Sequence, residues 1–145
     1  MPCFTVGYSH AKMLSDALKV PLLSFSHQQG HVAACLWSAG RLDVMDRPHL
    51  AWHLSGGTTE LLYVIPDEKN VCCTRIGGTT DISAGQLVDR TGQLLGLPFP
   101  SGRHLDQLSR GAADQDFFAV KCQDMEFSFS GLENKIRQYL SLIHI

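Results

Sequence analysis

Two histidines one helical turn apart, His27 and His31, are residue types that could bind a metal ion. On a helix, side chains four positions apart lie on one face, so both imidazoles can reach one cation. A metal site needs at least one more ligand, and the sequence gives none a fixed position. Two ordinary surface or core histidines are therefore the alternative. Gln28 stands where a zinc protease of the HExxH type has its glutamate base, which disfavours that class.

A run of small residues, Ser55-Gly56-Gly57-Thr58-Thr59, is the second candidate site. Glycine lets backbone N–H groups approach an anion closely, and the neighbouring hydroxyls add donors. A phosphate or an acyl phosphate would suit such a turn. A type I′ hairpin turn without any ligand is the alternative, because Gly-Gly favours that turn on its own.

The helix expected over residues 82–96 carries Gly85, Asp89 and Gly92 on one face, away from its apolar stripe. An interior glycine costs a helix roughly 1 kcal/mol relative to alanine. Two of them beside one carboxylate indicate that something packs closely there, either a ligand hydroxyl such as that of a ribose or another backbone. Farther along, Ser128 and Ser130 could donate to a phosphate or simply cap a helix.

The elements that must position these residues alternate between helix and strand, which predicts an α/β protein. We expect the glycines at 77–78 to form a loop, Asp81 to cap the helix that follows it, and Gly40 to close an earlier helix. The periodicity predicts helices over 9–18, 28–40, 82–95, 101–111 and from 131 onward, and strands over 21–27, 49–55, 58–65 and 71–76.

The composition is that of an ordinary globular chain: 145 residues, 44% hydrophobic, 18% charged, with a net charge of −2. No basic excess indicates nucleic-acid binding, so such a role would need a local patch or partner proteins. Five cysteines in no CxxC pattern are expected to be reduced thiols of a cytoplasmic protein. No apolar stretch approaches the ~18 residues of a membrane span, so no membrane partner is expected.

Five segments in order resemble the TsaD/Gcp family, formerly described as O-sialoglycoprotein endopeptidase: VGYSHAKMLSDAL, HQQGH, LSGGTTEL, GGTTDISAGQLVDRTGQLLGLPFPSG and FSFSGLENK. The resemblance implies the two-lobed ASKHA fold of actin, heat-shock chaperones and sugar kinases. It also implies a tRNA N6-adenosine threonylcarbamoyltransferase, which moves threonylcarbamoyl from threonylcarbamoyl-AMP to adenosine 37 of tRNA. The implied partners are threonylcarbamoyl-AMP, tRNA and accessory proteins of the same pathway, including a shortened paralogue.

The resemblance also implies a role for particular residues. The metal ligands of the family, which hold one iron or zinc ion, correspond to His27 and His31. No residue is assigned a catalytic role, and the family's third metal ligand, an aspartate, has no counterpart in this chain. The implied substrate-binding residues are His53, Leu54, Ser55, Gly56, Gly57, Asp89 and Gly102, of which Asp89 would contact the adenylate ribose.

At several positions the chain departs from the family pattern. Acidic residues are usual where Ile82 and Gln86 stand, lysine where Arg90 and Glu133 stand, histidine at Thr58 and glycine at Ser101. Two other functions therefore stay open. One is another nucleotide-binding enzyme of the same fold, such as a sugar kinase. The other is a non-catalytic paralogous subunit, although such subunits usually lack the two histidines.

Both ends of the chain read as cut. It opens directly on a helix and closes on LSLIHI, a hexapeptide encoded by a common sequencing adapter. We therefore expect residues 1–139 to be a Gcp-like fragment that lacks its N-terminal start and its C-terminal part. Residues 140–145 would be a non-native tail. Such a fragment is expected to be inactive alone, because groups of an incomplete site are poorly pre-organised.

Overall fold

The computed structural model describes residues 2–68, 70–112 and 118–143. The chain is α/β, as predicted, and contains one mixed sheet. Its elements in order are α1 (Pro2–Leu18), α2 (His27–Ser38), the 3-10 helix η1 (Leu42–Asp46), β1 (His49–Leu54), β2 (Thr59–Asp67), β3 (Asn70–Thr79), α3 (Ala84–Leu94), α4 (Gly102–Ser109), β4 (Cys122–Gln123), β5 (Glu126–Phe127) and α5 (Ser130–Ile143).

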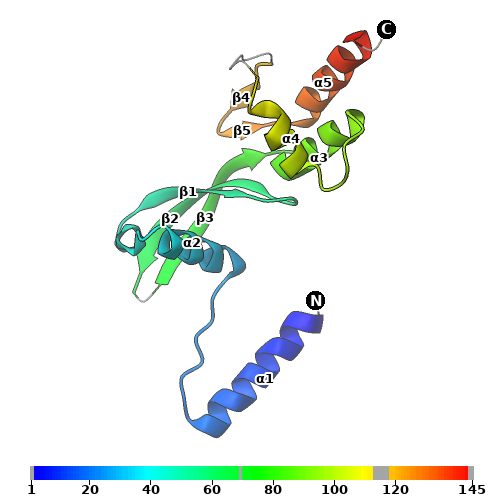
Figure 1. Cartoon of the computed structure of the whole chain (residues 1–145). Coiled ribbons are helices and arrows are strands. Elements are labelled where there is room, and N and C mark those ends of the chain that lie inside the picture. The colour runs from blue at the N-terminus through cyan, green and yellow to red at the C-terminus, as the bar shows by residue number, and fades with distance from the viewer. Residues whose placement is uncertain (1, 69, 113–117, 144–145) are drawn as a thin grey trace.

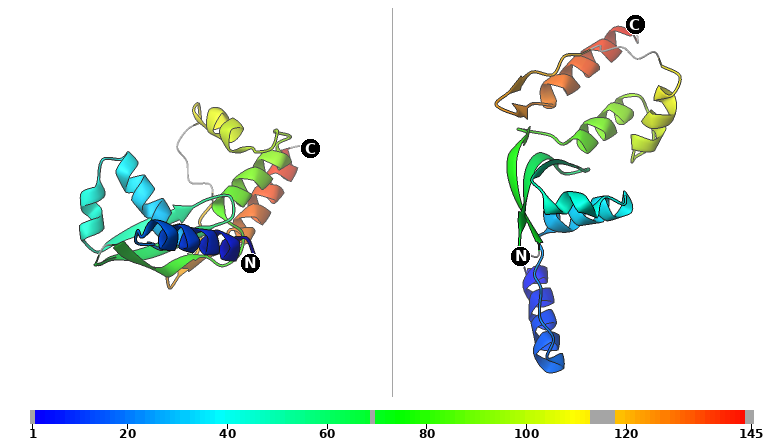
Figure 2. Two further views of the ribbon diagram at one scale, coloured as in Figure 1. Left: turned by 90° about the horizontal axis from the view of Figure 1, so that it is seen from below. Right: turned by 90° about the vertical axis from the view of Figure 1, so that its left-hand side faces the viewer.

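The sheet has the order β1-β2-β3-β5-β4, in which only the β3–β5 pair is parallel. Helix α2 lies against one face of β1, β2 and β3, as the views in Figures 1 and 2 show. Between them lies a small core of Val32, Leu62, Val64 and Val71, with Leu36, Met45, Ala51 and Cys73 around it. The helices α3, α4 and α5 gather beyond the far end of β3 (Figure 1).

Strand β1 alternates strictly between a covered and an exposed side, the period-two pattern of a sheet with one packed face. His49, Ala51 and His53 point to the side of α2, whereas Leu50, Trp52 and Leu54 are exposed. The alternation matters for the site, because it turns two imidazoles toward the histidine helix.

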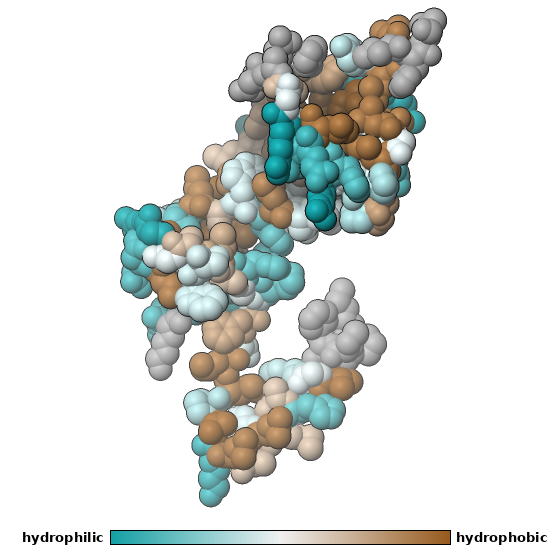
Figure 3. Space-filling view, viewed as in Figure 1, coloured by the Kyte–Doolittle hydropathy of each residue, from teal (hydrophilic) through white to brown (hydrophobic). Residues whose placement is uncertain are grey.

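Helix α1 stands apart from the rest in Figures 1 and 2, joined by the extended residues 20–26. Figure 3 shows apolar side chains on its surface, and Val6, Met13, Leu14 and Leu18 are each more than half exposed. Among the described helices, none combines the length and apolar character that crossing a bilayer requires.

Three sequence predictions about local structure are wrong. Residues 21–26 form no strand, because an extended segment becomes a strand only when a neighbour completes its hydrogen bonds. Gly77 and Gly78 lie inside β3 rather than in a loop, and Gly78 has φ +137°, a conformation open to glycine. Asp81 does not cap the following helix, since Ser83 occupies that position.

Candidate functional site

The start of α2 fixes the two candidate metal ligands. Ser26 and Gln29 form a reciprocal capping box, in which each side chain accepts a hydrogen bond from the other residue's backbone N–H. The Gln29 amide also donates to the carbonyl of Val71 in β3, which ties the first turn of the helix to the sheet. His27 is therefore the first residue of a helix with a fixed start, and His31 lies one turn later.

The imidazoles of His27 and His31 point toward each other. Their Nε2 atoms are 2.9 Å apart and their ring centroids 4.3 Å apart. One Nε2 must donate and the other accept, so each ring directs a nitrogen into the same space. This convergence is the geometry that two histidines on one helix face require if they are to share a cation.

A third imidazole, that of His53 from β1, lies beside this pair. Its ring centroid is 5.1 Å from that of His31 and 6.3 Å from that of His27. In the structure as it stands, no three His, Cys, Asp or Glu side chains of the described residues are arranged to hold a metal ion. A cavity of about 450 Å³ between α2 and β1 is lined by His31, His49 and His53, among others.

The glycine turn connects β1 to β2 through residues 55–58. Neither Gly56 nor Gly57 has a positive φ, so the type I′ turn is excluded. The Ser55 hydroxyl instead accepts hydrogen bonds from the backbone N–H groups of Gly57 and Thr58, at 3.2 and 2.9 Å. An anion that used these two amides would have to displace the serine oxygen.

The start of α3 packs directly on this turn. The Ser83 hydroxyl donates to the carbonyl of Gly56 at 2.6 Å, and the Ala84 N–H donates to the Thr59 hydroxyl at 2.8 Å. A Cβ on Gly85 would lie only 2.6 Å from the Gly56 Cα. The sequence left two neighbours open for this face of the helix, a ligand hydroxyl or another backbone. At Gly85 the neighbour is the backbone of Gly56.

Farther along α3, the same face meets Ser101. The Asp89 Oδ1 accepts a hydrogen bond from the Ser101 N–H at 2.7 Å, and the Ser101 side chain occupies the space that a Cβ on Gly92 would need. Gly102 follows as the first residue of α4, where a Cβ would contact Val88 at 3.7 Å. Asp89 and Gly102 therefore lie beside one buried serine, and their substrate-binding roles stay predictions.

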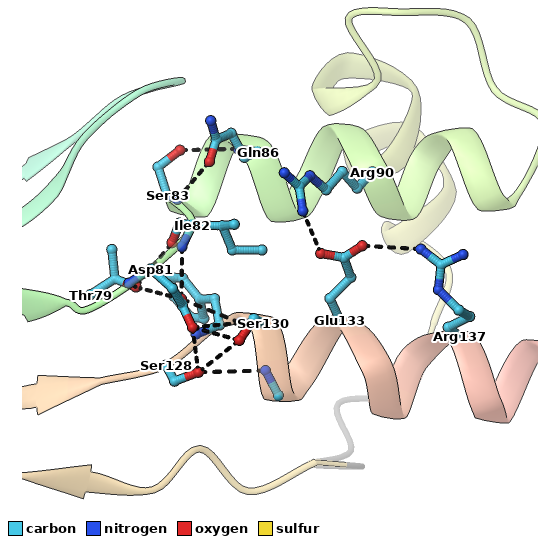
Figure 4. A network of polar contacts seen from close by, with 12 residues as sticks. Thr79, Asp81, Ile82, Ser83, Gln86, Arg90, Ser128, Ser130, Glu133 and Arg137 are labelled. Carbon is cyan, nitrogen blue, oxygen red and sulfur yellow. Dashed lines mark hydrogen bonds and ion pairs between the residues drawn. The ribbon is translucent and has the colours of Figure 1, made fainter.

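Asp81 links the end of β3 to the first turn of α5 (Figure 4). Its carboxylate accepts hydrogen bonds from the hydroxyls of Ser128 and Ser130 and from the backbone N–H groups of Ile82 and Phe129. Desolvation alone would raise the pKa of Asp81, but these hydrogen bonds outweigh it and hold the pKa well below its ordinary value. The two serines donate their hydroxyls to Asp81, and the Asp81 carboxylate, rather than either serine, caps the start of α5.

Two of the positions that depart from the family pattern face each other. Arg90 on α3 and Glu133 on α5 form an ion pair of 2.8 Å, and Arg137 approaches the other oxygen of Glu133 at 3.2 Å (Figure 4). Glu133 is only 8% exposed. A buried carboxylate between two guanidiniums is satisfied in charge and hydrogen bonding.

Sequence reasoning missed that His53 joins the histidine pair. The available signal was the period-two pattern of His49, Ala51 and His53, which puts both imidazoles on the covered face. The structure thus brings His27, His31 and His53 together and places Ser55, Gly56 and Gly57 against α3. Asp89 and Gly102 belong to the Ser101 cluster farther along that helix.

Comparison with known proteins agrees with the resemblance noted from the motifs. The family model described as tRNA N6-adenosine threonylcarbamoyltransferase matches residues 1–143. The chain is similar to proteins of that name from Lactococcus lactis subsp. cremoris (strain MG1363), with 34% identity over 96% of this chain, and from Salinibacter ruber, with 37% identity over 93%. A third, from Streptococcus equi subsp. zooepidemicus (strain MGCS10565), is 37% identical over 89%.

The match covers only part of these relatives. The chain spans 39% of the Lactococcus and Salinibacter proteins and 37% of the Streptococcus protein. The chain belongs to the TsaD family of tRNA N6-adenosine threonylcarbamoyltransferases.

Proposed function

We propose that the protein containing this chain transfers the threonylcarbamoyl group from threonylcarbamoyl-AMP to N6 of adenosine 37 in tRNA, within an ASKHA fold. The observation that carries the proposal is the convergence of the His27 and His31 Nε2 atoms, 2.9 Å apart, at the start of a capped helix. A nucleotide kinase of the same fold has no need of such a pair, whereas a metal-assisted acyl transfer does.

His27 and His31 would hold one iron or zinc ion. The donor set fits, because imidazole nitrogen suits both metals and the two nitrogens already share one small space. When bound, the ion supplies Lewis-acid polarisation of the carbamoyl oxygen. A third ligand is still required, and the resemblance assigns it to an aspartate outside these residues.

The remaining residues of the site would bind and orient the substrate. His53, Leu54, Ser55, Gly56 and Gly57 form the end of β1 and its turn, close to the histidine helix. Packing of α3 against the Gly56 backbone would hold that turn in place while the substrate binds. Asp89 would accept a ribose hydroxyl, and Gly102 would leave room for the nucleotide beside it.

The chain's net charge of −2 supplies no broad basic surface for tRNA. We therefore propose that tRNA binding depends on accessory proteins of the pathway, a shortened paralogue among them, and that the protein works in the cytoplasm. A dimerising partner would add basic side chains for the phosphates of tRNA.

The non-catalytic alternative has one specific observation in its favour. The resemblance places lysines at the positions of Arg90 and Glu133, and here the two side chains neutralise each other at 2.8 Å. A site in which one cation is replaced by a carboxylate and the other is paired with it binds a phosphate less well. Retention of both His27 and His31 argues the other way, since a scaffold has no use for metal ligands.

The test is tRNA modification by the full-length protein. Deleting its gene should abolish threonylcarbamoyladenosine in total tRNA, measured by mass spectrometry, and the wild-type gene should restore it. The His27→Ala, His31→Ala variant should fail to restore it, whereas His10→Ala, on the distant α1, should succeed. The isolated 145-residue chain should show no transfer.

Each rival function predicts a different result. Unchanged tRNA modification after gene deletion would favour the non-catalytic subunit. A metal-free protein that hydrolyses ATP rapidly in the absence of tRNA would favour the kinase-like enzyme. Full restoration by the double histidine variant would contradict the metal-assisted transfer proposed here.

A further inference from the structure

The side of β1 that faces α2 carries imidazoles where a packed face ordinarily carries apolar groups. His49, Ala51 and His53 occupy the covered positions of the strand, and β2 places Val64, Leu62 and Glu60 opposite them. The core residues Val64 and Leu62 are almost fully buried there. A strand that turns a histidine toward two others at the rim of such a core needs a physical reason, because burying an imidazole is costly.

The Nδ1 atom of His53 is buried and has no hydrogen-bond partner. Leaving such a group unsatisfied costs roughly 1–3 kcal/mol, so a buried orphan in a native fold indicates a missing partner. The nearest aromatic rings to His53 are those of His31 and His27, which direct their own Nε2 atoms into the adjoining space. A cation shared with the histidine pair would supply that partner.

The ring spacings suit a shared cation. Metal–nitrogen bonds of roughly 2 Å around a tetrahedral ion separate the centroids of neighbouring imidazoles by roughly 5 Å. The three observed separations, 4.3, 5.1 and 6.3 Å, lie on both sides of that value. The nitrogens are not arranged to hold an ion as they stand, since His27 and His31 bond to each other. Rotation of the rings about χ2 would redirect them, and that torsion is soft.

A carboxylate lies on the same face of the sheet. Glu60 lies opposite His53 in the β1–β2 ladder. It also accepts a hydrogen bond from the side-chain amide of Gln28, which lies between His27 and His31 in the first turn of α2. Arg75 approaches Glu60 at 3.8 Å, which offsets part of its charge. A carboxylate opposite His53 favours a bound cation over a bound anion.

We propose that His53 is the third imidazole of a metal site whose other two ligands are His27 and His31. The inference rests on the metal centre of the proposed function and deepens it: β1 supplies a metal ligand rather than only a substrate contact. The chain then carries three nitrogen ligands for a divalent ion such as Zn²⁺ and leaves the fourth tetrahedral position to the aspartate that the resemblance assigns.

The test is Zn²⁺ binding by the 145-residue chain, with affinity from competition with a chromophoric chelator and the imidazole count from X-ray absorption. The wild-type chain should bind one Zn²⁺ through three imidazoles. His53→Gln should weaken binding roughly tenfold or more and lower the count to two. His49→Gln is the matched control, because it removes the other orphaned imidazole of the same strand face and should change neither quantity.

The outcomes separate this inference from the function on which it rests. If the wild-type chain binds Zn²⁺ through only two imidazoles, and His53→Gln binds it as tightly, the role of His53 is overturned. The His27–His31 site would then still stand. No Zn²⁺ binding at all would overturn the three-imidazole site, whereas the proposed function, whose metal also takes a ligand from outside these residues, would be decided by the tRNA test. Three imidazoles in a full-length protein that does not modify tRNA would uphold the site and refute the transferase. Circular dichroism of the metal-free variants would exclude misfolding as the cause of any loss.

Discussion

The guanidinium of Arg90 on α3 lies 2.8 Å from the carboxylate of Glu133 on α5, and both residues depart from the family pattern. The resemblance places lysines at both positions, two like charges that would repel each other at this distance. Here the second position has changed sign, so the two departures form one interaction that joins the helices.

We predict that Arg90 and Glu133 stabilise the fold jointly. In a double-mutant cycle with Arg90→Ala and Glu133→Ala, the coupling free energy of unfolding should be roughly 1 kcal/mol, because Glu133 is mostly shielded from water. The matched pair is Glu133 with Arg137, four residues on in the same helix, whose coupling should be about 0.3–0.5 kcal/mol. Strict additivity of Arg90→Ala and Glu133→Ala would show that the ion pair is absent in solution.

Gly85→Ala should destabilise the chain. The new Cβ would lie 2.6 Å from the Gly56 Cα and 2.8 Å from the Ser55 carbonyl oxygen, both backbone atoms that cannot move aside cheaply. Overpacking of this kind costs roughly 1–3 kcal/mol, which exceeds the ~1 kcal/mol that alanine gains over glycine in a helix. Urea unfolding measures the difference.

Gly30→Ala is the control for that substitution. Gly30 lies inside α2, and a Cβ there would meet nothing within 4 Å, so only the gain in helix propensity should remain. The variant should be equal to or up to about 1 kcal/mol more stable than the wild type. If both alanines stabilise alike, α3 does not pack against the turn.

The capping box of α3, formed by Ser83 and Gln86, should contribute more to stability than that of α2, formed by Ser26 and Gln29. Ser26→Ala removes an exposed cap, for which we expect a loss of about 1 kcal/mol. Ser83→Ala removes the same kind of cap and also the 2.6 Å hydrogen bond to the Gly56 carbonyl, at a site only 2% exposed. The loss there should be larger, roughly 2 kcal/mol, since a second hydrogen bond worth roughly 1 kcal/mol is lost together with the cap. Equal losses in thermal or urea unfolding would contradict the contact.

Asp81 should make stability depend on pH at the acid end. Its pKa in the folded chain is lowered by four hydrogen-bond donors, against about 3.9 for an unperturbed aspartate. The contribution of Asp81 to the free energy of unfolding is therefore complete above about pH 4. It is lost as the pH falls through the lower pKa that Asp81 has in the folded chain. The difference in unfolding free energy between wild type and Asp81→Asn should shrink from pH 6 toward pH 2. A constant difference would refute the assignment.

The sequence predicted the elements with strong periodicity. Helix α2 was expected over 28–40 and is found at His27–Ser38, with Gly40 just beyond it at φ +67°. The strands of the hairpin lie within one or two residues of the prediction, because alternating side chains identify a half-covered strand. The convergence of His27 and His31 was also predictable, since helical spacing alone dictates it.

Other features could not be read locally because they depend on residues distant in sequence. Asp81 was predicted to cap α3, its nearest helix, yet it caps α5, which begins 49 residues later. The strand predicted over 21–27 lacks a pairing neighbour in the described part of the chain. Departures that looked like losses have structural roles here: Gln86 completes the α3 capping box, and Ser101 fills the gap left by Gly92.

The attachment of α5 through its first turn has a consequence for the connection that precedes it. Asp81 holds Ser128 and Ser130, and Glu133 holds Arg90, so the start of α5 is fixed by residues outside the segment between α4 and β4. Of that segment, Phe118 and Ala119 contact α5 through Tyr139 and Lys135. Doubling the length of such a link costs only ~0.6 kcal/mol of closure entropy. Insertions or a grafted tag should therefore be tolerated between Ser109 and Phe118, while the neighbouring helices keep their places.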